Sequence, residues 1–396
     1  MQSDHQVVVL SAVRTPIGRY GGSLKDTSMS ELGAITVREA ISRAGIAPSD
    51  VEHVVFGNVI HTEPKDMYLS RVAAIRAGIP VETPALTLNR LCGSGLQAIV
   101  SAAQFIWMGD AKVAVAGGAE SMSRAPYWLT GLRWGQRMND TTAMDIMVNA
   151  LTDPFENVHM GVSVENIAKK WGITREQQDC LAVESHRRAS NAVKSCFFQS
   201  QIVPIELKVK GGTTIFEKDE GPRADTTLEN LAKLKPAFDK NGTVTAGNAS
   251  TVNDGAASVV LMEKKTAQER GLKPIARLID YAVVGVDPKF MGIGPVPAVQ
   301  KVLQQTGMKI EDFDVFEVNE AFAVQALAVA RELGLPPDKT NPNGSGISLG
   351  HPVGATGAII AVKLIHELRR KGGRYGIATL CIGGGQGIAA IFENLN

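Results

Sequence analysis

Short apolar runs alternate with amphipathic stretches along the first 121 residues. The apolar runs are rich in β-branched side chains and end at Gly or Pro, which predicts buried strands, while the amphipathic stretches carry apolar residues at helical spacing. The strands are expected at 6–18, 51–60 and 110–121, and the helices at 30–46 and 70–79. Ser30 is the expected N-cap of the first helix and Gly45 its stop. This alternation favours an α/β unit with helices on both faces of a largely parallel sheet.

Cys92 lies at the mouth of a further predicted helix. An apolar approach ends at Leu88, Gly93 and Gly95 bracket a tight turn, and a helix rich in Ala, Ile and Val is predicted from Leu96 onward. The free N–H groups and partial positive charge of a helix N-terminus stabilise a thiolate, so we expect the pKa of Cys92 to be lowered. By itself this pattern is compatible both with a nucleophile and with an inert buried thiol.

The last third of the chain repeats the pattern of the first. Segment 35–59 resembles segment 296–320, with Gly45 against Gly307 and Asp50 against Asp312 at one constant offset. The Cys92 helix and the strand after it are likewise paralleled by 354–370 and the apolar run that follows. The repeat predicts a duplicated α/β unit with an active site between its halves.

Residues 122–250 have a different character. An irregular aromatic segment is followed by polar helices and then by a charged stretch rich in Gly, Asp and Lys. We interpret this region as an insertion that covers part of the α/β unit. The alternative is a solvated surface region with no role beyond stability.

Composition limits the classes of function. The chain has 44% hydrophobic and 20% charged residues and a formal net charge of +1, which gives no indication of a nucleic-acid partner or of binding to an anionic membrane. It holds no apolar run long enough for a membrane span, and Asp4 and His5 stand where a secretory signal would be basic, so we expect a cytoplasmic protein. The four cysteines lack metal-ligand spacing and are too sparse for a disulfide scaffold.

Three further candidates lie beside glycines in the second half. His351 is on a Gly/Pro loop just before a helix, Cys381 ends a buried strand ahead of three glycines, and Asn319 with Glu320 stands where a strand ends and a helix starts. Each has an ordinary alternative, since His351 could cap a turn, Cys381 could be a core thiol and Asn319 could be an N-cap. Together with Cys92, on one expected edge of the fold, they indicate a shared site.

Four sequence blocks carry a resemblance to a known family. They are NRLCGSGLQA, NEAFA, GHPVGATGA and CIGGGQG, at 89–98, 319–323, 350–358 and 381–387. In this order and at these intervals they resemble the signature blocks of the thiolases, over essentially the whole chain. The resemblance implies a thiolase-like α/β fold of duplicated mixed-sheet halves stacked in layers, with an inserted loop domain. The implied domains are an N-terminal half at 1–121 completed by 251–271, a loop domain at 122–250 that covers the CoA site, and a C-terminal half at 272–396.

The same resemblance implies the catalytic roles. Cys92 matches the nucleophile, His351 the base that takes its proton, and Cys381 the acid/base of the condensation step. Asn319 is expected to hold a water which, with His351, stabilises an enolate oxygen, and the N–H groups of Cys92 and Gly383 are expected to stabilise the tetrahedral oxyanion. No metal or redox cofactor is implied, because coenzyme A is itself substrate and product.

The matching CoA-binding residues are Leu151, His159, Met160, Arg223, Phe238, Ala246, Gly247, Ser250, Met291 and Phe322. Arg223 is expected near the nucleotide end of CoA, and Phe238, Met291 and Phe322 along the pantetheine channel. Segment 124–139 matches the region that packs thiolase subunits into a dimer of dimers, which implies a homotetramer. Thr251 stands where the family usually has glycine, so it could narrow the CoA end of the channel or shift the loop.

The chain is most similar to bacterial β-ketothiolases that make short 3-ketoacyl-CoA precursors of polyhydroxyalkanoate. The implied reaction is a reversible, ping-pong Claisen condensation of two acyl-CoA molecules through an acyl-Cys92 intermediate. The alternatives are a degradative 3-ketoacyl-CoA thiolase of fatty-acid β-oxidation, a related condensing enzyme, and a non-catalytic acyl-CoA-binding protein. Cys381 argues against the related condensing enzymes, which pair the nucleophile with two histidines or with a glutamate and a histidine.

Overall fold

The internal repeat of the sequence corresponds to two similar groups of strands in one mixed sheet. The computed structural model describes residues 6–396, so Asp4 and His5 lie outside the described residues. The strands of the first group are β1 (Val7–Arg14), β2 (Gly18–Arg19), β3 (His53–Gly57), β4 (Ala85–Leu88), β5 (Val113–Ser121) and β10 (Asn253–Glu263). Those of the second group are β11 (Ala276–Gly285), β12 (Val315–Val318), β13 (Tyr375–Ile382) and β14 (Gln386–Asn394).

The two groups share one topology. In the first, β10 is antiparallel to β1 and β5, and β5 is parallel to β3; in the second, β14 is antiparallel to β11 and β13, and β13 is parallel to β12. The groups join where residues 7–9 of β1 pair with residues 276–278 of β11. The expectation of a largely parallel sheet is wrong, because β10 and β14 each enter the middle of a group in the opposite direction. The mixed sheet implied by the thiolase resemblance is confirmed.

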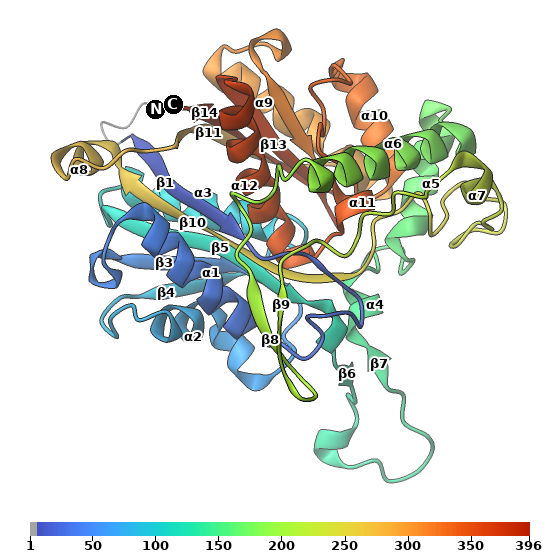
Figure 1. The fold of residues 1–396 in the computed structure, drawn as a ribbon. Coiled ribbons are helices and arrows are strands. Elements are labelled where there is room, and N and C mark those ends of the chain that lie inside the picture. Colours follow the sequence, from blue (N-terminus) through green and yellow to red (C-terminus); the bar gives the residue numbers. More distant parts are fainter. Residues whose placement is uncertain (1–5) are drawn as a thin grey trace.

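The helices of the repeated units are α1 (Met29–Ala44), α2 (Leu69–Arg76), α3 (Ser94–Trp107), α8 (Lys264–Glu269), α9 (Pro295–Thr306), α10 (Ala323–Leu333), α11 (Gly346–Leu349) and α12 (Val353–Lys371). They form layers with the strands (Figure 1). Helices α1 and α2 cover the outer face of the first group of strands, and α9 and α10 cover the outer face of the second. Helices α3 and α12 lie between the two groups and contribute to the largest apolar core. None of the helices in residues 6–396 combines the length and the apolar character that a membrane crossing requires.

The first helix begins two residues earlier than the sequence pattern indicates. Ser28, not Ser30, is the N-cap of α1, because Ser28 has extended backbone angles while Ser30 already lies inside the helix and is buried. Gly45 ends the helix as expected, with a positive φ of 68°.

The two central helices touch through glycine. A Cβ atom on Gly95 of α3 would lie 2.5 Å from the Ala358 nitrogen, and one on Gly357 of α12 would lie 2.3 Å from the Leu96 nitrogen. Any side chain at either position would therefore force the helices apart. Because Gly95 and Gly357 lie near the N-terminal ends of their helices, this contact brings the N-termini of α3 and α12 together.

Residues 122–250 extend over one end of the layers. Their elements are β6 (Tyr127–Trp128), β7 (Met144–Asp145), α4 (Ile146–Ala150), α5 (Met160–Trp171), α6 (Arg175–Lys194), β8 (Ile205–Val209), β9 (Gly212–Phe216) and α7 (Leu228–Ala232). Helices α5 and α6 pack against α10, while the segment between β6 and β7 projects away from the rest of the molecule (Figure 1). This projecting segment is aromatic and exposed; the side chain of Trp134 is 91% accessible. Short 3₁₀ helices occur at Pro48–Asp50, Pro64–Tyr68, Met122–Arg124, Leu132–Trp134, Pro288–Ile293 and Ile310–Asp312.

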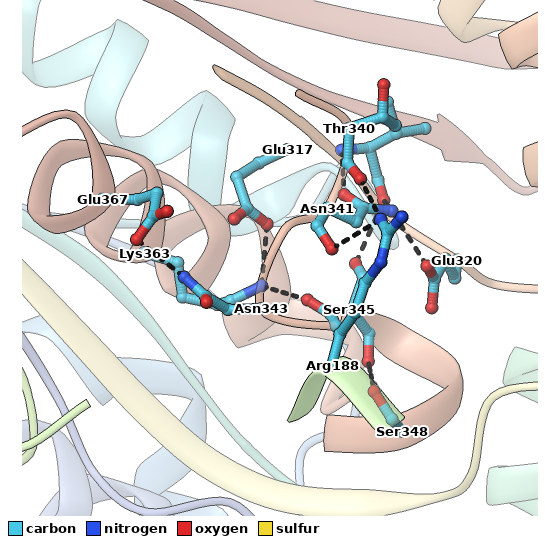
Figure 2. A network of polar contacts seen from close by, with 12 residues as sticks. Arg188, Glu317, Glu320, Thr340, Asn341, Asn343, Ser345, Ser348, Lys363 and Glu367 are labelled. Atoms are coloured by element: carbon cyan, nitrogen blue, oxygen red, sulfur yellow. Dashed lines mark hydrogen bonds and ion pairs between the residues drawn. The ribbon is translucent and has the colours of Figure 1, made fainter. Parts of the chain in front are cut away.

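A buried ion pair connects β12 to α12 (Figure 2). Lys363 is 2% exposed, and its Nζ lies 2.7 Å from Glu317 Oε2 and 2.6 Å from the Gly344 carbonyl oxygen. One turn further along α12, Glu367 accepts a hydrogen bond of 2.8 Å from the Asn343 side chain. These contacts fix the strand end that precedes Asn319 against the central helix and the loop before α11.

We expect Lys363→Met to lower the free energy of unfolding by ~3–5 kcal/mol, because it leaves the Glu317 carboxyl buried without its partner. Lys371→Met on the same helix is the control; Lys371 is more exposed and lies 3.7 Å from Glu367, so its loss should cost less than ~1 kcal/mol. Replacing both partners, as Glu317→Leu with Lys363→Met, should recover much of the loss. Chemical denaturation measures all three, and equal stability of the two single variants would contradict a structural role for the pair.

Candidate active site

Cys92, His351, Cys381 and Gly383 line one cavity of about 160 Å³ where the N-termini of α3 and α12 meet the turn between β13 and β14. The rest of the lining is largely apolar. The other lining residues are Met122, Leu151, His159, Met160, Phe238, Ala249, Ser250, Thr251, Val252, Met291, Ala321, Phe322 and Val353. The structure therefore brings together thiols and an imidazole that lie almost 300 residues apart in the sequence.

A strained turn presents Cys92 to this cavity. Leu91 has a positive φ of 45°, which is unfavourable for a residue with a Cβ atom. The turn is held by Ser94, whose Oγ accepts a hydrogen bond of 2.8 Å from the Arg90 N–H and donates one of 2.7 Å to the Leu91 carbonyl. A Cβ atom on Gly93 would lie 2.6 Å from Ile382, so the turn packs directly on β13. This packing sets Cys92 opposite Cys381, the neighbour of Ile382.

The expected lowering of the Cys92 pKa is wrong. Cys92 keeps part of its surface open to the cavity, but burial raises the pKa of its thiol to about 11. The N–H groups of Gly383 and Cys92 favour the thiolate and lower this pKa, yet they do not outweigh the loss of water. Cys92 therefore rests as a thiol and needs a base before it can act as a nucleophile.

His351 has the protonation that such a base requires. Its Nδ1 lies 2.6 Å from Thr356 Oγ1, and that hydroxyl donates its proton to the Pro352 carbonyl at 2.9 Å. The hydroxyl consequently accepts from Nδ1–H, which leaves a lone pair on Nε2. Burial lowers the pKa of His351 to about 4, so the ring is neutral near pH 7. His351 is thus held as a neutral base rather than as a simple turn cap.

Thr251 is linked to the His351 backbone through the Asn253 side chain. Its Oγ1 donates a hydrogen bond of 2.8 Å to Asn253 Oδ1, which also accepts one of 2.9 Å from the His351 N–H. Thr251 lines the cavity, while its hydroxyl is engaged with Asn253. Thr251, where the family usually has glycine, therefore forms part of the cavity wall.

Asn319 reaches His351 from the end of β12. Its Nδ2 lies 3.4 Å from His351 Nε2, and among the described residues its buried Oδ1 has no hydrogen-bond partner. The interpretation of Asn319 as an N-cap is wrong, because the N-cap of α10 is Phe322. Asn319 instead directs its side-chain amide toward the imidazole.

The residue before Asn319 is held on several sides. The Asn341 side chain accepts from the Val318 N–H and donates to the Val318 carbonyl, both at 2.8 Å, and also contacts Glu320 Oε1 at 3.0 Å (Figure 2). Glu320 is itself buried and accepts a hydrogen bond of 2.6 Å from Ser185. The Asn319 amide is therefore presented by a fixed backbone.

Cys381 lies near the end of β13, and Gly383 lies in the turn between β13 and β14. Cys381 is buried, and burial together with the neighbouring Cys92 raises the pKa of its thiol. A Cβ atom on Gly383 would lie 2.1 Å from the end of the Met160 side chain, so a larger residue here would displace that side chain. Positive φ angles at Gly384 and Gly385, of 78° and 86°, complete the turn. The glycines thus allow α5 to close over the second thiol.

Most of the expected CoA-binding residues line the same cavity. They are Leu151, His159, Met160, Phe238, Ser250, Met291 and Phe322. The rings of His159 and Phe238 stack with centroids 4.4 Å apart. Arg223, Ala246 and Gly247 do not line it; the first two are exposed, and Gly247 packs beside Leu231 and Leu234. The sequence analysis missed Met122, Ala249, Val252, Ala321 and Val353, because apolar residues in this setting carry no signal that separates a cavity wall from a core.

No group of three or more His, Cys, Asp and Glu side chains suited to a metal ion occurs within residues 6–396.

The comparisons with known proteins cover the whole length of the chain. Residues 7–265 match the thiolase N-terminal domain and residues 272–394 the thiolase C-terminal domain. The beta-ketothiolase BktB of Cupriavidus necator is 61% identical, over 98% of this chain and 99% of that protein.

Solved structures agree with these matches. The Bacillus anthracis acetyl-CoA acetyltransferase has a TM-score of 0.97 and 49% identity and covers 100% of both chains. Human mitochondrial 3-ketoacyl-CoA thiolase in complex with CoA has a TM-score of 0.96 and 45% identity and covers 98% of both. With both domain models matched in order and the four sequence blocks gathered at one cavity, the chain belongs to the thiolase family.

Proposed function

We propose that this protein is a β-ketothiolase, an acyltransferase that condenses two acyl-CoA molecules reversibly to a 3-ketoacyl-CoA and CoA. The observation that carries the proposal is the meeting of two thiols with raised pKa values and a neutral imidazole on one apolar cavity. A thiol that rests protonated beside a neutral base is suited to transient activation, and a second thiol supplies the proton transfer that carbon–carbon bond formation needs. The identity to a relative named beta-ketothiolase supports this choice.

In the proposed first half-reaction, His351 Nε2 takes the proton of Cys92. The thiolate attacks the thioester carbonyl of the first acyl-CoA, CoA leaves as a thiol with that proton, and an acyl-Cys92 thioester remains. The N–H groups of Cys92 and Gly383, which favour the Cys92 thiolate, are assigned to the oxyanion of the tetrahedral intermediates. The apolar walls exclude water, which strengthens the proton transfer contact between His351 and Cys92 and the hydrogen bonds to the oxyanion.

In the second half-reaction, the Cys381 thiol first gives its proton to His351 Nε2, and the resulting thiolate removes a proton from the α-carbon of acetyl-CoA. The carbanion attacks the acyl group on Cys92, which departs as a thiolate and takes up the proton held by His351. The enolate oxygen is assigned to His351 and to a water held by the Asn319 side chain, whose Oδ1 is buried without a partner among the described residues. Because the Asn319 side chain is already held in place, little free energy is spent on reorienting it during the reaction.

Coenzyme A is assigned to the mouth of the cavity. The stacked rings of His159 and Phe238, with Met291 and Phe322, form walls suited to the pantetheine arm. Arg223, Ala246 and Gly247 lie outside the cavity, so we assign them to the more distant nucleotide part of CoA. CoA is substrate and product in this scheme, and no step uses a further cofactor.

The remaining assignments concern the whole protein. We propose a loop domain at 122–250 between an N-terminal half (1–121 with 251–271) and a C-terminal half (272–396). The exposed aromatic segment between β6 and β7 is suited to contacts within a homotetramer, because such large apolar side chains are costly to leave in water. We place the protein in the cytoplasm, in the synthesis of short 3-ketoacyl-CoA for polyhydroxyalkanoate.

The test is thiolysis by the purified protein, followed as loss of 3-ketoacyl-CoA absorbance with free CoA on acetoacetyl, 3-ketovaleryl and 3-ketohexanoyl substrates. We expect turnover of the short substrates, and we expect Cys92→Ser to lower it by ~1000-fold or more because an alcohol is far less ionised than a thiol. A clear preference for the longest substrate would favour the degradative thiolase. No turnover of any substrate would favour a non-catalytic binding protein.

Cys381→Ala should separate the two half-reactions. We expect acetyl-CoA still to acylate Cys92, seen by mass spectrometry as one added acetyl group, while condensation is lost. Cys180→Ala, which removes an exposed thiol on α6, is the matched control and should keep both acylation and condensation. Loss of acylation together with condensation would show that Cys381 is not confined to the second step.

The raised pKa of Cys92 predicts a pH dependence for its alkylation. Because a thiol with a pKa of about 11 is still mostly protonated at pH 9, the rate constant for modification by iodoacetamide should keep rising from pH 7 through pH 9. Modification is assigned to Cys92 by peptide mass spectrometry, with Cys180 as an exposed internal reference. A rate constant for Cys92 that levels off below pH 8 would contradict the raised pKa.

A further inference from the structure

Glu120 is a buried carboxylate that the catalytic scheme above does not use. It lies at the end of β5 and is fully buried. Its Oε1 accepts hydrogen bonds from the Asn58 side chain at 2.9 Å and from the Ile60 N–H at 3.1 Å. Its Oε2 accepts from the Val59 N–H at 3.0 Å and from the Gly354 N–H at 2.8 Å. All four donors are N–H groups, so the site is built for an acceptor on both oxygens.

These donors come from both halves of the molecule. Segment 58–60 follows β3 in the first group of strands, whereas Gly354 is the second residue of α12. A Cβ atom on Gly354 would lie 2.4 Å from Glu120 Oε2, so glycine is required for this approach. The carboxylate also meets the positive end of a helix of 19 residues, which favours its charge.

Glu120 holds the segments that pack against Cys92. Ile60 and Val353 belong to one buried apolar cluster, against which Cys92 packs. Val353 also lines the cavity and is two residues from His351. Glu120 thus satisfies the backbone N–H groups of the very segments whose side chains surround Cys92.

We propose that Glu120 is a positioning residue for acyl transfer: its buried carboxylate holds segment 58–60 and the start of α12 in one arrangement around Cys92 and His351. This inference rests on the proposed function for its kinetic consequence. It also has a consequence that does not need turnover, because the Glu120 carboxylate behind Cys92, once ionised, acts on the thiol itself.

The charges around the two groups set the sign of that effect. The Glu120 carboxylate raises the pKa of Cys92, in the same direction as burial, while the N–H groups of Gly383 and Cys92 lower it. The other titratable groups on the cavity are Cys381, His159 and His351. Burial raises the pKa of Glu120 itself to about 8, opposed by its N–H donors, with Asp66 as the nearby acid that adds to the rise. Removing the Glu120 charge should therefore make Cys92 easier to ionise above about pH 8, where Glu120 is ionised.

The experiment compares Glu120→Gln, Glu120→Asp and the exposed control Glu311→Gln. Glu120→Gln replaces one acceptor oxygen by an NH₂ group, which cannot accept hydrogen bonds from the surrounding N–H donors. It also removes the charge. We expect kcat for thiolysis to fall by ~100-fold with KM within a few-fold, since small displacements of reacting groups cost this much. The pH profile of Cys92 alkylation should move to lower pH in the same variant.

Glu120→Asp separates charge from loosening of the fold. It keeps the charge but is one methylene shorter, so kcat should fall while the alkylation profile stays at the wild-type position. If both variants move the profile equally, the shift comes from loosening and the electrostatic part of the inference fails. Wild-type kcat in folded Glu120→Gln would overturn the positioning role.

Gly354→Ala provides a second route to the same contact. The added methyl group meets Glu120 Oε2 from the α12 side, so it should reproduce the loss of kcat even if Glu120→Gln does not fold. Unchanged kcat in folded Gly354→Ala would also overturn the inference. Absence of turnover in the wild-type protein would instead reject the proposed function, and the alkylation profiles would still decide whether the Glu120 charge acts on Cys92.

Discussion

The close approach of α3 and α12 is the constraint on which the site depends. Gly95 and Gly357 let the two helices meet backbone to backbone near their N-terminal ends. Residues just ahead of these helices, Cys92 and His351, are therefore neighbours even though they belong to different halves. Two helix N-termini pointing at one spot also supply free N–H groups there, and the buried carboxylate of Glu120 takes up one of them.

Much of this architecture is predictable from local patterns. The strands, the central helices and the internal repeat follow from hydrophobic period and from glycine positions, and the resemblance of four short blocks indicates which loops converge. The cap of α1 was placed two residues too late, since Ser28 and Ser30 are equivalent by residue type and only the backbone angles distinguish them. The largely parallel sheet was also wrong, because nothing local shows that β10 enters beside β1 from 240 residues away.

The electrostatics of the site were the least predictable part. A helix N-terminus at Cys92 is visible in the sequence, but the depth of burial that raises the pKa of this thiol depends on walls from five or more distant segments. For the same reason Arg223, a residue type suited to phosphate, could be named from resemblance but not located relative to the cavity. Glu120 illustrates the converse, because a single acidic residue in an apolar strand gives no indication that four N–H donors will surround it.

The pairing of β1 also has a consequence for how the chain is made. This strand begins at Val7, yet its partners are residues 257–263 of β10 and residues 276–278 of β11. A ribosome synthesises its product from the N-terminus, so β1 emerges long before residues 257–263 and 276–278, which form its neighbours. Such long sequence separation makes the pairing of β1 with its neighbours a late and slow step of folding. Until then, the unpaired edges of this apolar strand are available for pairing with strands of other chains.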